Sequence, residues 1–208
     1  QLEANGINPL YIHLFRDGRD VALSFKKAIV GEKHMYHIAK QWKEEQEASL
    51  QLAEKLGNER VIKVRYEDLL AAPELELRKI CSFIGATYQP EALDYYHSEE
   101  SHKTALSGVM WENVEKPVIA DNFNKYKKEL TPDDILIFEQ VAGDTLRKLG
   151  YSLDLNGSTG HDFSADEINI FDAANKKLKQ EARLKTKPED LEKRRNQEEL
   201  LKNIQTRI

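Results

Sequence analysis

The sequence predicts an α/β fold in which helices alternate with a small number of strands. Residues 11–15 (Tyr-Ile-His-Leu-Phe) are apolar apart from one His, which is the pattern of a buried strand. A turn at residues 16–18 (Arg-Asp-Gly) follows, and a helical pattern begins directly after it. Residues 61–64 (Val-Ile-Lys-Val) indicate a second short strand. A strand that turns straight into a helix is typical of open sheets whose carboxyl-terminal edge binds nucleotides.

The remaining predicted elements are helices, each with a local signal for its start or its end. The expected helices cover residues 18–28, 34–56, 73–84, 90–96 and 132–149. Gly57, Gly85 and Gly150 end three of them, and Pro132 opens the last after a Thr N-cap. Residues 98–122 are expected to form a polar loop longer than about 15 residues, a length that usually signals function or disorder.

Composition divides the chain into a folded domain and a tail. The expected parts are a domain at residues 1–155, a linker at 156–163 and a charged helical tail at 164–208. The tail pattern predicts two helices, 166–187 and 189–208, separated by Pro188. Because neither helix offers a broad apolar face, we expect a solvated appendage that packs weakly or joins another domain.

The overall composition restricts the class of protein. A net charge of −5 gives no global attraction for nucleic acid. One cysteine, Cys81, allows no internal disulfide and favours a reducing, cytoplasmic compartment. No apolar run approaches the ~20 residues of a membrane span. His34 and His37 share a helix face but lack a third ligand, so we expect no metal site.

The first strand and helix place two anion-binding side chains near each other. Arg16 is predicted at the carboxyl end of the strand, and Ser24 about two turns into the helix. A guanidinium offers a forked set of donors to a phosphate, and the hydroxyl adds another. These residues alone leave a second interpretation open, in which Arg16 and Asp17 form a surface ion pair beside a turn.

Two further motifs make the chain resemble the sulfotransferases that use 3′-phosphoadenosine 5′-phosphosulfate (PAPS). They are residues 65–70 (Arg-Tyr-Glu-Asp-Leu-Leu) and residues 115–118 (Glu-Lys-Pro-Val) with Lys125 nine residues after Lys116. The resemblance covers about residues 8–153. It implies that Arg16 and Ser24 hold the 3′-phosphate of the cofactor, that Tyr66 lies against the adenine, and that Lys125 adds a positive charge.

The resemblance also implies a fold and a missing part. The expected fold is the three-layer, P-loop NTPase-like sulfotransferase fold with a parallel sheet, incomplete at its amino terminus. Residues 1–9 hold no Gly- and Ser/Thr-rich loop for the 5′-phosphosulfate, and the catalytic base is unassigned. We interpret His13 as a structural residue of the strand. We therefore expect the chain alone to be inactive, and an upstream segment or a partner chain to complete the sheet.

The implied reaction is transfer of a sulfuryl group to an acceptor hydroxyl or amine, without a metal. The acceptor is open. Tyrosine sulfation is not implied, because Ala28 stands where the tyrosylprotein branch has a basic residue and Tyr126 stands where it has a Trp. Two alternatives remain from the residues: a nucleotide kinase-like protein of related fold, and a non-catalytic nucleotide-binding or interaction module.

Overall fold

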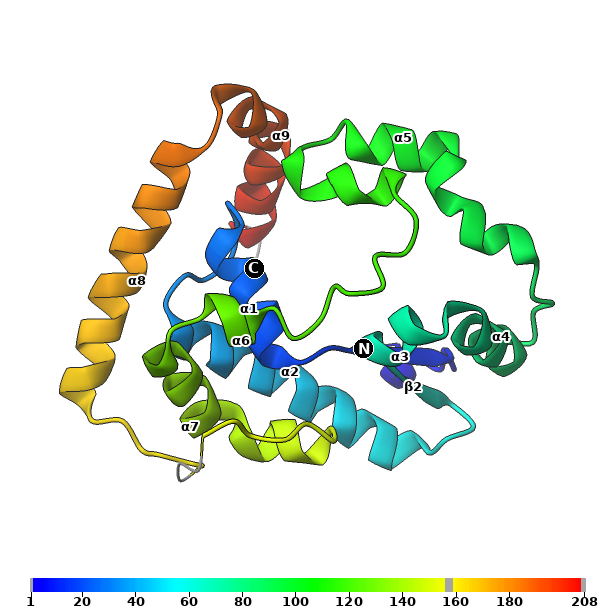
Figure 1. The fold of residues 1–208 in the computed structure, drawn as a ribbon, viewed down its shortest axis with the longest axis horizontal. Helices are drawn as coiled ribbons and strands as arrows, with labels where there is room; N and C mark the ends of the chain where they lie inside the picture. The colour runs from blue at the N-terminus through cyan, green and yellow to red at the C-terminus, as the bar shows by residue number, and fades with distance from the viewer. Residues whose placement is uncertain (1, 156–158, 207–208) are drawn as a thin grey trace.

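The structure is a computed structural model that describes residues 2–155 and 159–206 (Figure 1). The elements in chain order are η1 (Glu3–Asn5), β1 (Tyr11–Phe15), α1 (Gly18–Lys27), α2 (Met35–Leu56), β2 (Val61–Arg65), α3 (Tyr66–Ala71), α4 (Pro73–Ile84), η2 (Pro90–His97), α5 (Glu99–Ala105), η3 (Val109–Glu115), α6 (Tyr126–Glu129), α7 (Pro132–Lys148), α8 (Ala165–Lys185) and α9 (Pro188–Gln205). The η elements are 3-10 helices.

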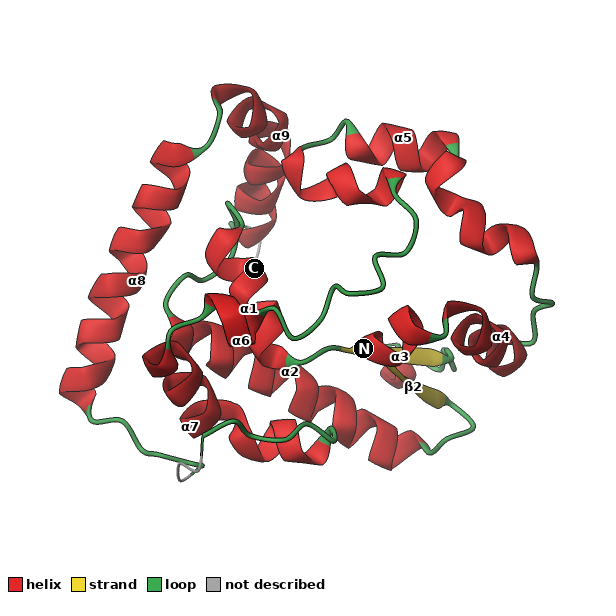
Figure 2. Ribbon diagram, viewed as in Figure 1, coloured by secondary structure: helices red, strands yellow, loops and turns green. Residues whose placement is uncertain are grey.

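The described residues contain one sheet, in which β1 and β2 run parallel (Figure 2). Its register pairs Tyr11 with Val61 and Phe15 with Arg65. The next residue of each strand, Arg16 or Tyr66, therefore leaves the sheet at the same edge. The α/β class expected from the sequence is confirmed, and the register explains how two motifs 50 residues apart in the sequence meet.

The hydrophobic core lies where α1, α2 and α7 pack together beside the sheet (Figure 1). Trp42 of α2 lies against Phe138 of α7, with the ring centroids 5.6 Å apart. Gly18 begins α1 directly against both rings, because a Cβ there would come within 2.4 Å of Phe138 and 2.7 Å of Trp42. The glycine of the turn is thus required by close packing.

Two segments differ from the sequence prediction. β2 extends to Arg65, and Tyr66 begins the short helix α3, which the sequence pattern had not indicated. The expected polar loop at residues 98–122 contains α5 and η3. Each helix has only seven residues, which is too short for a helical periodicity to be recognised against a loop.

The tail contacts the rest of the chain through α8. Asn175 is buried, and its side-chain oxygen accepts the backbone N–H groups of Lys33 and His34 at 2.8 and 3.0 Å. Phe171 stacks on the His34 ring at 4.5 Å. One buried amide and a few rings therefore anchor α8 to the start of α2. Of the expected linker, residues 156–158 lie outside the described residues.

Within the described ranges, every helix is either too short or too polar to cross a lipid bilayer.

Candidate functional site

Arg16 and Tyr66 meet at the carboxyl-terminal edge of the sheet. The Arg16 guanidinium lies over the Tyr66 ring, 4.7 Å from its centroid. Asn122, from the segment before α6, joins them: its backbone oxygen accepts a hydrogen bond from Arg16 at 2.8 Å, and its side-chain amide donates to the Tyr66 hydroxyl at 2.9 Å. The Arg16 Nε–H is buried and has no partner within the described residues, so one donor of the guanidinium is left unpaired at this edge.

Glu67 ties the start of α3 to the turn that follows β1. One carboxylate oxygen accepts the backbone N–H of Asp17 at 3.0 Å, and the other accepts the Tyr151 hydroxyl at 2.8 Å. Tyr66 and Glu67 therefore have different roles, although they are neighbours in the sequence. Tyr66 faces Arg16, and Glu67 fixes the turn from which Arg16 projects.

Asp20 holds the segment that carries Lys125. Its carboxylate accepts the backbone N–H groups of Asn124 and Tyr126 at 2.6 and 2.9 Å. Asp20 is only 1% exposed, and the Tyr126 ring beside it is buried in the core. Lys125, which lies between the two bonded residues, is thereby fixed next to the first turn of α1.

Opposing effects act on the pKa of the Asp20 carboxyl group. Burial raises the pKa of its carboxyl group, whereas the two backbone hydrogen bonds and the positive charge of Arg16 lower it; burial has the larger effect, and the net shift is upward. The electrostatic interaction with Arg16 also connects the Lys125 segment to the Arg16–Tyr66 pair.

Arg19 is a structural residue, although it lies three positions from Arg16. It is 2% exposed and makes ion pairs with Asp17 at 2.8 Å and Glu139 at 2.6 Å. Its guanidinium also lies 4.3 Å from the centroid of the Tyr126 ring. Burial disfavours the charge, but the carboxylates of Asp17 and Glu139 outweigh it and raise the pKa of Arg19. Its donors point into the protein, which leaves Arg16 as the arginine of this turn that faces outward.

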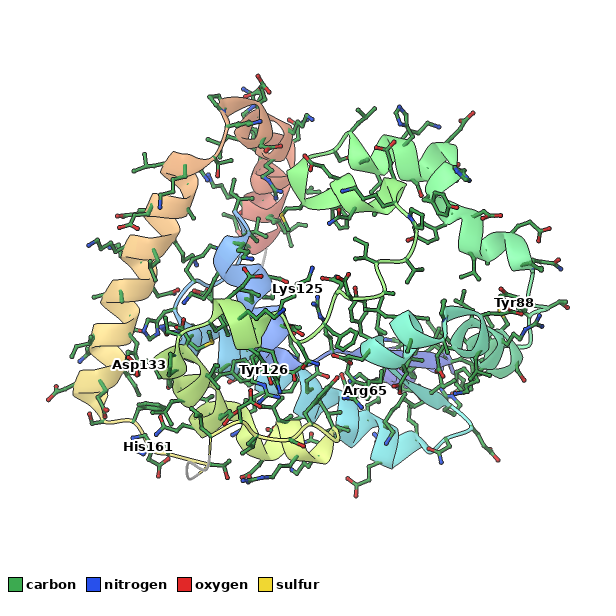
Figure 3. The ribbon with its side chains drawn as sticks, in the orientation of Figure 1. Arg65, Tyr88, Lys125, Tyr126, Asp133 and His161 are labelled. Carbon is green, nitrogen blue, oxygen red and sulfur yellow. The ribbon has the colours of Figure 1, made fainter. Side chains whose placement is uncertain are left out.

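Ser24 and Lys125 make no hydrogen bond or ion pair with Arg16 or Tyr66 within the described residues, and each is joined to Asp20 or to its hydrogen-bond partners. The Ser24 hydroxyl is exposed and donates to the backbone oxygen of Asp20 at 3.1 Å, one helical turn earlier. Lys125 is half-buried at the start of α6, and Figure 3 shows it on the opposite side of this short helix from Tyr126. The structure thus brings Arg16 and Tyr66 into contact and links Ser24 and Lys125 to them through Asp20.

The sequence also favours a structural role for His13 and predicts no metal site. His13 is buried, and its Nε2 lies 2.8 Å from the Gln46 side-chain oxygen, while its ring packs against Phe15. This is the environment of a structural strand residue. In the part of the chain that the structure describes, no group of three His, Cys, Asp or Glu side chains is arranged to hold a metal.

Sequence reasoning missed Asn122 and Asp20. Asn122 lies in an aperiodic segment, where no pattern reports which backbone oxygen faces Arg16. Asp20 sits in the first turn of a helix, where an acid is ordinary because it complements the helix dipole.

Comparison with known proteins shows that this region is similar to sulfotransferases. Residues 8–90 match the family model described as the sulfotransferase family. The chain is 27% identical over 157 residues to protein-tyrosine sulfotransferase A of Caenorhabditis elegans, a match that covers 72% of this chain and 40% of that protein. The chain therefore spans less than half the length of this curated relative.

Two solved structures share the fold. The sulfotransferase domain of the Synechococcus PCC 7002 olefin synthase superposes with a TM-score of 0.53 at 24% identity, covering 69% of this chain and 50% of that one. The sulfotransferase domain of the curacin biosynthetic pathway gives a TM-score of 0.55 at 23% identity, covering 72% of this chain and 56% of that one. The resemblance to sulfotransferases and the expected sulfotransferase fold are confirmed.

Proposed function

We propose that this chain supplies the 3′-phosphate- and adenine-binding side of a sulfotransferase that uses PAPS and transfers its sulfuryl group to an acceptor hydroxyl or amine. The observation that carries the proposal is the Arg16–Tyr66 pair, with the Arg16 Nε–H left without a partner at the sheet edge. A guanidinium with an open donor suits a phosphate oxygen, and the adjacent ring suits a purine face.

The roles of the residues follow from their chemistry. Arg16 donates to the 3′-phosphate, and the Ser24 hydroxyl exchanges its bond to the Asp20 carbonyl for one to the same phosphate. Tyr66 packs on the adenine, while Asn122 holds the Tyr66 hydroxyl. Lys125, held by the backbone bonds on either side of it, supplies a further positive charge.

PAPS supplies the reactive sulfuryl group, whose bond to the 5′-phosphate breaks as a bond to the acceptor oxygen or nitrogen forms and the acceptor loses a proton. A transfer of this kind depends on positioning and on stabilisation of charge in an in-line displacement. The residues described above orient the nucleotide. We assign no residue as the base, and we propose that the 208 residues alone do not turn over, because residues 1–9 contain no phosphosulfate loop.

The decisive experiment is a comparison of two nucleotides by calorimetry. Adenosine 3′,5′-bisphosphate should bind at least about tenfold more tightly than adenosine 5′-phosphate, since one charged hydrogen-bonded contact is worth about 1.5–3 kcal/mol. Arg16→Ala should abolish this preference. Arg195→Ala removes an equal charge from an exposed pair with Glu192 and should leave the preference intact. Equal affinity of the unaltered chain for the two nucleotides would refute the proposal.

A further inference from the structure

The exposed end of α1 opens into a cavity that the tail closes. The cavity has a volume of about 750 Å³ and lies between α1, η3 and the hairpin formed by α8 and α9. Ser24 lines it from α1, and Lys185 and Lys187 line it from the turn between the two tail helices. Figure 1 shows α9 beside the end of α1, with α8 forming an outer wall. We call this cavity the tail chamber.

The tail chamber is basic although the whole chain is acidic. Six Lys and Arg side chains line it against two acidic ones, Glu181 and Asp190, whereas the net charge of the chain is −5. Excess positive charge around an exposed hydroxyl favours an anionic ligand. The volume is in the range that ligand sites of about 300–1,000 Å³ occupy.

Most of these cations are already engaged. Lys26 pairs with Asp134, and Lys27 pairs with Glu129. The Lys33 ammonium donates to the backbone oxygens of Phe25, in the last turn of α1, and of Val30, in the loop after it, at 2.7 and 2.6 Å. Across the residues that the structure places, Lys185 and Lys187 make no side-chain hydrogen bond or ion pair. The ammonium groups of Lys185 and Lys187, at the tail turn, are therefore available to a ligand.

Specific contacts hold the tail helices in place around the chamber. Lys193 of α9 donates to the Leu106 backbone oxygen at 2.6 Å, and the Arg194 guanidinium lies 3.1 Å from the Met110 sulfur. Asp190 lies so close to Gly108 that a Cβ there would be 3.2 Å from its carboxylate oxygen. On the other side, Asn175 anchors α8. These contacts fix the tail turn, which lines the chamber together with Ser24.

We infer that Lys185 and Lys187 complete the binding site for the phosphate that Ser24 holds, so that the tail selects nucleotides with a 3′-phosphate. This inference rests on the proposed function and extends it to a segment beyond the region that resembles sulfotransferases. Both lysines line the same chamber as Ser24, and neither has a carboxylate partner among the described residues. A nucleotide lacking the 3′-phosphate gains nothing from them.

The test uses the full chain and two doubly substituted variants. Lys185→Ala/Lys187→Ala removes the two available cations. Lys177→Ala/Lys202→Ala removes the same charge from exposed positions of the same two helices, neither of which lines the chamber. Calorimetry with adenosine 3′,5′-bisphosphate and with adenosine 5′-phosphate, at low and at physiological salt, gives four affinities for each protein.

We expect the chamber variant to bind the bisphosphate about tenfold more weakly, with a shallower salt dependence and unchanged affinity for adenosine 5′-phosphate. The control variant should match the unaltered chain, and Lys185→Arg/Lys187→Arg should restore binding. Equal bisphosphate affinity in the chamber and control variants would overturn the inference. If the preference for the bisphosphate then persists and still depends on Arg16, the proposed function stands without the inference; if the unaltered chain shows no preference, the proposed function itself fails.

Discussion

The Asp20 carboxylate accepts the backbone N–H of Tyr126 at 2.9 Å, so a side chain in the first turn of α1 fixes a segment 106 residues further along the chain. The same carboxylate accepts the N–H of Asn124. Asp20 therefore acts as a positioning residue for Lys125, which lies between them. It is buried and does not face a ligand itself.

Asp20→Ala should weaken binding of adenosine 3′,5′-bisphosphate about tenfold. Two backbone donors lose their acceptor, of which the Tyr126 N–H is buried and costs ~1–3 kcal/mol when unsatisfied, and Lys125 loses its position. Asp20→Asn should have a smaller effect, since the amide oxygen still accepts one of the two bonds. Calorimetry measures both. Asp121→Ala, an exposed acid of the neighbouring segment, is the control. Equal affinities for Asp20→Ala and Asp121→Ala would exclude the positioning role.

Arg19→Ala should lower the free energy of unfolding by about 3–5 kcal/mol, because it leaves two buried carboxylates, Asp17 and Glu139, without their cation. Urea denaturation followed by circular dichroism measures the loss. Arg195→Ala, on the exposed face of α9, should change stability by no more than about 0.5 kcal/mol. If Arg19→Ala lowered the free energy of unfolding by an equally small amount, the buried ion-pair network would contribute little to stability.

Acidification should loosen the contact between α2 and α8 through His34. Burial lowers the pKa of the His34 imidazole below its ordinary 6.5, and the charges of His37 and Lys26 add to this while Asp134 opposes it. Because the pKa in the folded state is depressed, this contribution to stability is present above pH 6.5 and is lost as the pH falls below it.

His34→Asn keeps a polar side chain at the N-cap of α2 and removes the titration. The melting temperature of the unaltered chain should fall between neutral pH and pH ~5 more steeply than that of His34→Asn. His97→Asn, at an exposed position, should follow the unaltered chain. Parallel curves for all three proteins would remove His34 as the source of the pH dependence.

The outer face of β1 should promote self-association. Ile12 and Leu14 are 47% and 53% exposed, and on the side away from β2 the strand has no partner within the described residues. An exposed apolar strand edge favours pairing with another chain. Ile12→Thr/Leu14→Thr should reduce the scattering mass in light-scattering measurements. Ile170→Thr/Leu184→Thr, which removes exposed apolar side chains from α8, should not. A monodisperse monomer from the unaltered chain would count against this prediction.

The contact between Arg16 and Tyr66 can be predicted from the sequence because it depends on regular structure. Two adjacent parallel strands end at one edge of the sheet, and each residue follows a strand that is recognisable by its composition. Asn122 and Asp20 depend on the path of an aperiodic segment, which no periodicity encodes. The anchoring of α8 was missed for a related reason. It relies on the single buried amide of Asn175, and one polar residue on a charged helix carries no pattern.

The pairing of Phe15 with Arg65 also protects the site against a particular folding error. If β2 slipped by one residue, Glu67 would take the place of Tyr66 beside Arg16, and every side chain of the strand would change face. A carboxylate would then neutralise the guanidinium that is proposed to receive the nucleotide. A misregistered molecule would therefore be unable to bind its anion, and nucleotide in solution would stabilise only the correctly paired chain by mass action.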